Sequence, residues 1–145
     1  AYVSRLLLTM FGAYLALGTL QAAVAPKAPE DLKKLARHVV SGTVVDVTSK
    51  VQKSTVETAL GIHRDRVYTI TVKVKEVAKG EGVKAGEQIT VVAWKPVKRF
   101  PALPGPQGHE TIPEKGNVVT LFLEGNKAHG YEPILPNGIE IDPAE

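Results

Sequence analysis

The side chains best suited to bind a metal are four histidines, and their spacing predicts no metal site. They lie far apart in the chain, at His38, His63, His109 and His129. None has a second histidine or a carboxylate at a ligand spacing such as H-x-E or H-E-x-x-H, since His109 and Glu110 are merely adjacent. The chain also lacks cysteine, which excludes disulfides and thiolate sites. We therefore expect no metal, and the alternative is that distant histidines converge in the fold.

The nucleophile and phosphate motifs are also incomplete. Ser41 lies within a predicted strand rather than in a G-x-S-x-G elbow, so we expect a hydroxyl in a barrel wall. Gly80, Gly82 and Gly86 fit neither the dinucleotide nor the Walker pattern, and they join two predicted strands. No pair of carboxylates has a spacing that indicates a shared cleft. Because no catalytic group of residues results, we expect a non-enzymatic protein that uses no cofactor.

One loop has the composition of a protein-binding surface. Residues 95–116 contain five of the ten prolines, and a loop of this length in a compact domain is usually functional. Aromatic and arginine side chains, which dominate binding hot spots, lie at its start. The alternative is a plain surface loop whose Phe100 folds back on the domain. The predicted contact residues are Trp94, Lys95, Lys98, Arg99, Phe100, Pro101, Pro104 and His109.

The same aromatic and basic residues, together with Tyr68, are also the types that bind single-stranded nucleic acid. The net charge is only +3, and the basic and acidic residues are interspersed along the sequence. This pattern is typical of a solvated surface rather than a nucleic-acid footprint. We therefore expect no nucleic-acid partner.

A membrane anchor is predicted by residues 6–26, which carry no charge between Arg5 and Lys27. About 20 mostly apolar residues form a helix of roughly 30 Å, the thickness of the hydrocarbon core of a bilayer. Small residues one turn apart allow membrane helices to approach closely. The pattern therefore predicts a face that packs against another membrane subunit. Its residues are Thr9, Gly12, Ala13 and Ala16.

The alternative for this stretch is a cleaved secretory signal. Arg5 precedes an apolar core, and the sequence AVA before Pro26 fits an A-x-A cleavage site. Pro26 would follow the scissile bond, however, where its locked φ and tertiary amide fit a protease poorly. A signal-like start places the C-terminal part outside, whereas the bases in residues 27–37 favour the cytoplasm. We expect an uncleaved single-pass anchor in the inner (cytoplasmic) membrane, with the following domain on the periplasmic side.

Residues 27–145 are long enough for one domain with its own core. The clearest element is a strand over residues 66–77, where apolar side chains alternate strictly with polar ones. We expect residues 49–63 to form a polar, mobile loop, or to contain a weak strand around residues 55–60, and we expect a buried strand over residues 117–123. Further strands are predicted over residues 38–47, 88–94, 129–135 and 139–141.

Two local features refine this prediction. Residues 29–37 have a proline near the start, acids in the first turn and bases in the last, which indicates a short helix. Its apolar face would comprise Leu32, Leu35 and Ala36 and plug one end of a barrel. Gly42 lies within a predicted strand, where it indicates a bulge or bend, and the alternative is close approach of a ligand.

Short strands, regular turns and the absence of a βαβ rhythm predict a mainly β fold. We expect a small, OB-like, partly open β-barrel of about five strands, with one short N-terminal helix and a single transmembrane helix before it. In the order of its elements, in Lys79-Gly80 and in the run LPNGIE at residues 135–140, the chain resembles small exported bacterial barrels of the netrin/TIMP-like type. That resemblance implies an OB-like fold and assigns no catalytic residue.

These observations together predict a protein that acts by contact. We expect an accessory subunit that holds or caps a larger membrane complex, with other membrane proteins and the lipid bilayer as its partners. The different-class alternative is a free periplasmic barrel that binds a small ligand or inhibits an exported enzyme.

Overall fold

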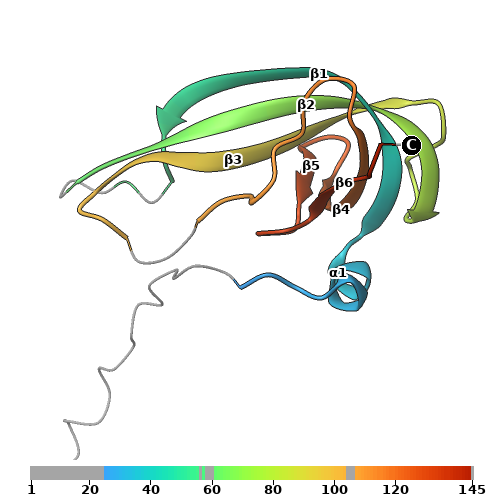
Figure 1. Cartoon of the computed structure of the whole chain (residues 1–145), viewed down its shortest axis with the longest axis horizontal. Helices are drawn as coiled ribbons and strands as arrows, with labels where there is room; N and C mark the ends of the chain where they lie inside the picture. The colour runs from blue at the N-terminus through green and yellow to red at the C-terminus, as the bar shows by residue number, and fades with distance from the viewer. Residues whose placement is uncertain (1–24, 56, 58–60, 104–106, 145) are drawn as a thin grey trace, which may run out of the picture.

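The computed structural model describes residues 25–55, 57, 61–103 and 107–144 (Figure 1). Within these residues, no helix has the length and hydropathy needed to cross a bilayer. The predicted packing residues Thr9, Gly12, Ala13 and Ala16 lie outside the described part of the chain. The elements are α1 (Pro29–Leu35), β1 (His38–Lys53), β2 (Ile62–Lys79), β3 (Gln88–Phe100), β4 (Val118–Asn126), β5 (Gly130–Pro133) and β6 (Ile139–Ile141).

The strands form one sheet that closes partly into a ring. Its order is β1-β2-β3-β5-β4, and β1 also pairs with β4, while β6 pairs with β4 at the margin. The contact between β3 and β5 is parallel and consists of one residue pair, Val91 with Tyr131. All other pairings are antiparallel. The prediction of a mainly β fold with one short helix and about five barrel strands is confirmed at this level.

Alternating side chains fill the ring, as the period of two predicts. Ile70, Val72 and Val74 on β2 are almost fully buried. They pack with residues of β1, β3 and β4, among them Val44, Val91 and Leu121. The predicted burial of the strand over residues 117–123 holds for most positions, although Val118 at its start is exposed.

Gly42 allows two strands to approach closely. The pairing of β1 with β2 shifts register between Ser41 and Gly42, which marks a bulge. A Cβ atom at Gly42 would collide with the carbonyl oxygen of Lys73. The bulge predicted for this glycine is therefore confirmed, because backbone occupies the space that a ligand would need.

Helix α1 does not plug an end of the ring, which corrects the prediction. Leu32 and Ala36 pack with Val39, Phe122 and Ile134 in a second cluster. Val39 and Phe122 are direct partners in neighbouring strands, and they alternate with residues of the core, so this cluster covers the outer face of the sheet. Leu35, predicted to be apolar contact, is 57% exposed. The helix is too short to bury more than one row of side chains.

The N-terminal end of the described chain is tied to the turn between β5 and β6. The backbone N–H of Lys27 donates to Oδ1 of Asn137 at 3.0 Å, and Nδ2 of Asn137 donates to the Lys27 carbonyl at 2.8 Å. The Lys27 ammonium donates to the carbonyl of Leu135 at 2.6 Å. These bonds fix the segment that leads into α1.

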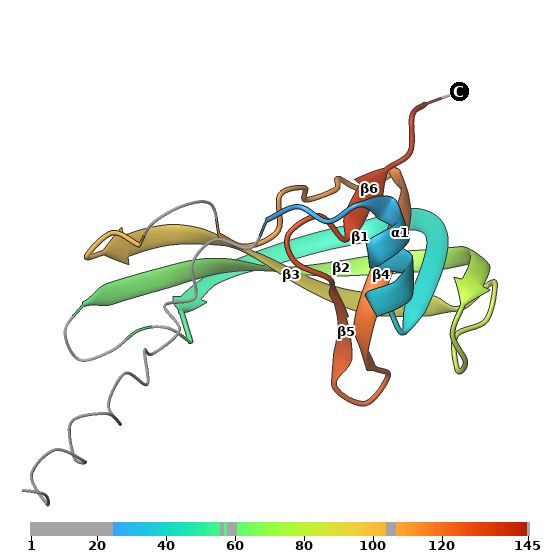
Figure 2. The ribbon, with the colours of Figure 1, turned by 90° about the horizontal axis from the view of Figure 1, so that it is seen from below.

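Strands β1, β2 and β3 are longer than the sequence pattern indicated. They contain 16, 18 and 13 residues, against about 5–6 for a common strand. Figure 2 shows their ends running out beyond the ring as a three-stranded extension. We call this extension, with the described residues that join its strands, the arm; it comprises residues 48–55, 57, 61–69 and 92–100. Much of the predicted polar loop at residues 49–63 is therefore strand, because β1 continues to Lys53 and β2 begins at Ile62.

The predicted loop at residues 95–116 also begins later than expected. β3 continues through Pro96 to Phe100, so the first six residues of that stretch are strand. Pro96 is tolerated because its nitrogen faces away from β2, as does the Trp94 N–H two residues earlier, so no ladder hydrogen bond is lost; the next residue, Val97, has no partner in β2 and marks a bulge. Further along, the described residues 107–116 bond to the ring and to the turn before β6: the Glu110 N–H donates to the carbonyl of Pro136 and the Gly116 N–H to that of Val44, both at 2.8 Å.

Candidate functional site

The arm concentrates positive charge that looks evenly spread in the sequence. It contains seven basic and two acidic residues, a net charge of +5, while the whole chain carries +3. Although the charges are interspersed along the sequence, they are not evenly distributed in the folded protein, since the chain outside the arm is net negative. The basic residues are Lys50, Lys53, Arg64, Arg66, Lys95, Lys98 and Arg99, and the acidic residues are Glu57 and Asp65.

Most of these bases lie on one face of the sheet. In the ring, the same face carries the core side chains, and we call it the inner face. Directly paired residues of adjacent strands lie on the same face, as do residues two apart in one strand. The row of core residues Val47, Ile70 and Val91 therefore continues outward as three rows. They are Ser49–Tyr68–Ala93, Val51–Arg66–Lys95 and Lys53–Arg64–Lys98.

Both acids of the arm are already paired. Asp65 Oδ1 accepts from Nη2 of Arg99 at 2.5 Å, and both side chains are about a tenth exposed. Glu57 forms an ion pair with Arg64, and Lys53 lies 4.0 Å from it. Within the described part of the chain, the other bases of the arm form no ion pair; Lys50 and Lys98 are exposed, and Arg66 and Lys95 are partly exposed.

Arg99 stabilises the arm rather than presenting a free charge. Besides Asp65, its guanidinium donates to the Arg64 carbonyl at 3.1 Å and to Gln107 Oε1 at 2.9 Å. Its Cζ atom lies 6.0 Å from the centre of the Trp94 ring. Trp94 itself is partly buried. Of the predicted contact residues, these two are therefore mainly structural.

The outer end of the arm is apolar. Phe100 is 67% exposed, Val97 is 53% exposed, and Ile62, the direct partner of Phe100, is 43% exposed. The alternative in which Phe100 folds back on the domain is therefore wrong. Pro101 is exposed beside it, whereas the predicted contact residue Pro104 lies outside the described residues. The arm thus ends in apolar side chains surrounded by bases, a composition typical of binding surfaces.

His109 was predicted to contact a partner, but its side chain is only 1% exposed. Its Nδ1 accepts from the Trp94 N–H at 3.0 Å, so its Nε2 carries the proton and donates to the carbonyl of Pro133 at 2.9 Å. Burial lowers the pKa of His109 below its usual value, although its bonds to the Pro133 and Trp94 backbones oppose this shift. The neutral imidazole of His109 thus joins β3 to the end of β5, at the point where these two strands share only one residue pair.

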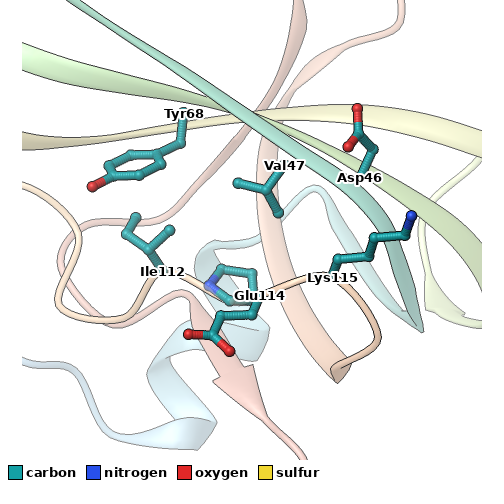
Figure 3. A pocket seen from close by; sticks show the side chains of 7 residues that line it. Asp46, Val47, Tyr68, Ile112, Glu114 and Lys115 are labelled. Carbon is teal, nitrogen blue, oxygen red and sulfur yellow. The ribbon is translucent and has the colours of Figure 1, made fainter.

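A pocket of about 500 Å³ lies where the arm meets the ring. Figure 3 shows Val47, Tyr68 and Ile112 pointing toward one another, with Asp46 and Lys115 at the opposite end from the Tyr68 ring. Tyr68 and Ile112 also pack against the core. The lining residues are Asp46, Val47, Tyr68, Ile112, Pro113, Glu114 and Lys115. Its apolar part is formed by Val47, Tyr68, Ile112 and Pro113, and the charged side chains of Asp46, Glu114 and Lys115 form the rest of the lining.

The histidines do not assemble a metal site within the part of the chain that is described. No group of three or more histidine or acidic side chains is placed there to hold an ion. His38 and His63 are buried in different regions, and His129 is exposed. His38 packs edge-on against Tyr131 with ring centres 5.2 Å apart, a contact of the core.

No family model, curated protein or solved structure matches the chain. The function must therefore be inferred from the arm, the pocket and the surface around them.

Proposed function

We propose that this protein is a non-enzymatic interaction subunit whose arm docks on an acidic surface of a partner in a larger membrane complex. The segregation of charge carries the proposal: a net charge of +5 lies on a projection that ends in exposed apolar side chains. Complementary charge accelerates encounter and fixes orientation, while a central apolar contact holds the complex.

The arrangement of strands supports an OB-like barrel as the base of the arm. This assignment is supported by the strand order β1-β2-β3-β5-β4 and by the pairing of β1 with β4, because an OB-fold is a five-stranded, partly open barrel. In such barrels, strands 2 and 3 commonly carry the binding surface. Here β2 and β3 supply Arg66, Lys95 and Lys98 to the inner face of the arm.

The proposal includes a membrane anchor formed by residues 6–26, with the barrel on the periplasmic side of the inner membrane. It is supported by the apolar character of that stretch and by Pro26 after the A-x-A sequence. Extraction of membranes with alkaline carbonate tests it. The full-length chain should stay in the pellet, and a released chain that begins after Ala25 would overturn the anchor.

Charge removal on the arm tests the docking function. The double variant Arg66→Gln/Lys98→Gln should lose about tenfold or more in co-purification of partner subunits from detergent extracts, because it removes two unpaired bases. The control Lys75→Gln/Lys84→Gln makes the same charge change at exposed positions outside the arm and should leave the partner bound.

Salt provides an independent readout of the same docking function. Raising the ionic strength should weaken the wild-type complex and affect the arm variant less. Equal retention by the arm variant and the wild type at every salt concentration would exclude arm docking. The co-purified partner subunits can then be identified by mass spectrometry.

A further inference from the structure

The outer edge of β1 is paired for only part of its length. β4 pairs with β1 over His38–Thr43, and the loop then takes over at Val44, which exchanges backbone hydrogen bonds with Gly116 and Asn117. On the opposite edge, β1 remains paired with β2 as far as Lys53. Among the described residues, no strand pairs with the outer edge over Asp46–Lys53.

An open edge of this kind can accept another strand. Its eight residues extend over about 26 Å, and alternate backbone N–H and C=O groups point away from β2. An extended peptide added there would satisfy these groups and continue the sheet. Figure 1 shows this part of β1 running along the margin of the arm.

We propose that the partner docks by adding an extended acidic segment to this edge as a further strand of the arm. This inference rests on the proposed function and specifies how the arm recognises its partner. The charge of the arm selects an acidic segment, since added side chains on the inner face would lie beside the rows that contain Arg66 and Arg64.

The same charges exclude a second copy of this chain as the occupant. Pairing β1 with its own copy would bring Lys50 and Lys53 of both chains together, and would place two arms of net +5 side by side. Lysines on an edge strand are a usual protection against such self-pairing. An acidic strand turns this protection into attraction.

The pocket at the root of the arm supplies specificity. Val47 belongs both to the open edge and to the pocket wall, so the added residue opposite Val47 lies beside the apolar hollow formed with Tyr68 and Ile112 (Figure 3). Added residues opposite Val51 and Lys53 lie on the same face, beside the basic rows. The recognised segment therefore has one apolar residue matched to Val47 and acidic residues matched to Val51 and Lys53.

A synthetic peptide with this pattern tests the mode of binding on the full-length chain in detergent. It carries a leucine matched to Val47, glutamates matched to Val51 and Lys53, and threonines between them. A peptide of the reversed sequence tests the other strand direction. Hydrogen exchange of amides in Asp46–Lys53 should slow in the presence of one of them, because edge N–H groups become bonded. Replacing both glutamates by lysine should weaken binding by about tenfold or more.

Two substitutions on neighbouring positions provide matched controls. Val47→Glu places a charge in the pocket and should abolish binding of the peptide, whereas Thr48→Glu, on the opposite face of the same strand, should retain most of it. Since Val47 packs against the core, its variant could also fold poorly. The exchange measurement on the wild-type chain does not depend on that variant.

The outcomes separate this inference from the function on which it rests. Peptide binding without slower exchange in β1, or equal binding of the lysine peptide, would overturn strand addition. Arm docking would then still stand if Arg66→Gln/Lys98→Gln loses the partner. If that double variant keeps the partner, arm docking fails whatever the peptide does. Slower exchange of the β1 edge at high concentration of the chain alone would identify a second copy as the occupant and overturn the acidic segment.

Discussion

The ring and the arm are built from the same three long strands, yet their surfaces differ completely. In the ring, the inner face of β1, β2 and β3 is covered, and residues such as Ile70 and Val91 are fully buried. Further along the same strands, the inner face is open and carries Arg66, Lys95 and Lys98. A continuous sheet thus changes from core to exposed surface without a change in secondary structure.

This difference separates stability from recognition. Hydrophobic burial in the ring provides the folding free energy, in proportion to the apolar area removed from water. Beyond Tyr68 and Ala93, which pack in the core at its base, the described part of the arm has no such core and depends on its hydrogen-bonded ladder, the Asp65–Arg99 pair and the Trp94 contact. Under the proposed function, substitutions in the ring should mainly reduce the free energy of unfolding, whereas substitutions of exposed residues in the arm should mainly reduce the affinity for the partner.

The largest effect on stability is expected from Leu121→Ala in the ring. Leu121 is 1% exposed, and truncating a buried leucine leaves a cavity that costs about 2–5 kcal/mol. The matched change Phe100→Ala at the end of the arm should alter the free energy of unfolding by only about 0.5 kcal/mol, because Phe100 is 67% exposed. Urea denaturation of both variants measures the contrast, and similar losses would break the distinction between ring and arm.

A smaller effect is expected from Asp65→Ala in the arm. It leaves the Arg99 guanidinium without its carboxylate in a site about a tenth exposed, which should cost about 1–3 kcal/mol because Arg99 keeps its bonds to Gln107 and to the Arg64 carbonyl. Since the Asp65–Arg99 pair lies in the arm, away from the core of the ring, faster hydrogen exchange should be concentrated in residues 62–69 and 92–100. The double variant Asp65→Ala/Arg99→Met should recover part of the loss, and uniform acceleration throughout the ring would contradict this description.

The smallest effect is a pH dependence that comes from the junction of ring and arm. Burial lowers the pKa of His109 in the folded chain, so the unfolded chain binds the proton more readily. The contribution of the neutral His109 imidazole to the free energy of unfolding is complete above about pH 6.5. It falls as the pH decreases toward the pKa in the folded chain, by up to about 1.4 kcal/mol per pH unit. His109→Gln should flatten this slope in thermal unfolding curves.

Glu132 contributes a slope of the opposite sign. Burial, with the charge of Glu124 adding to it, raises the pKa of Glu132, so the folded chain binds that proton more readily. Its contribution to stability decreases as the pH rises through the folded pKa. Subtracting the curve of His109→Gln from that of the wild type isolates the histidine, and an unchanged slope would show that His109 does not control it.

The sequence predicted the ring better than the arm, and burial explains why. Strict alternation in residues 66–77 revealed a strand with one buried face, and the buried face of that strand is the core of the ring. Beyond Tyr68 the inner face carries arginines and lysines in place of aliphatic residues, so the alternation disappears although the strand continues. Pro96 also led to the prediction of a loop where β3 continues to Phe100, with a bulge at Val97.

The candidate site was only partly visible for a related reason. Aromatic and basic composition pointed to the segment that begins at Trp94, and Phe100 in that segment is exposed, although its role in contact stays a prediction. The roles of His109 and Arg99 were missed, since both are set by partners distant in the sequence, Pro133 and Asp65. The spacing of Arg64 with Arg66, two apart on one strand face, was the available signal for the basic rows.

The bonds between Lys27 and the turn at Asn137 have a mechanical consequence. Two hydrogen bonds join the Lys27 backbone to the side-chain amide of Asn137, and a third joins the Lys27 ammonium to the Leu135 carbonyl. The segment is therefore a rigid attachment rather than a flexible tether. Whatever lies before Lys27 therefore meets the barrel at one fixed point of its circumference. Relative to Lys27, the direction in which the arm projects is therefore fixed, and under the proposed docking function this would present the open edge of β1 in one orientation.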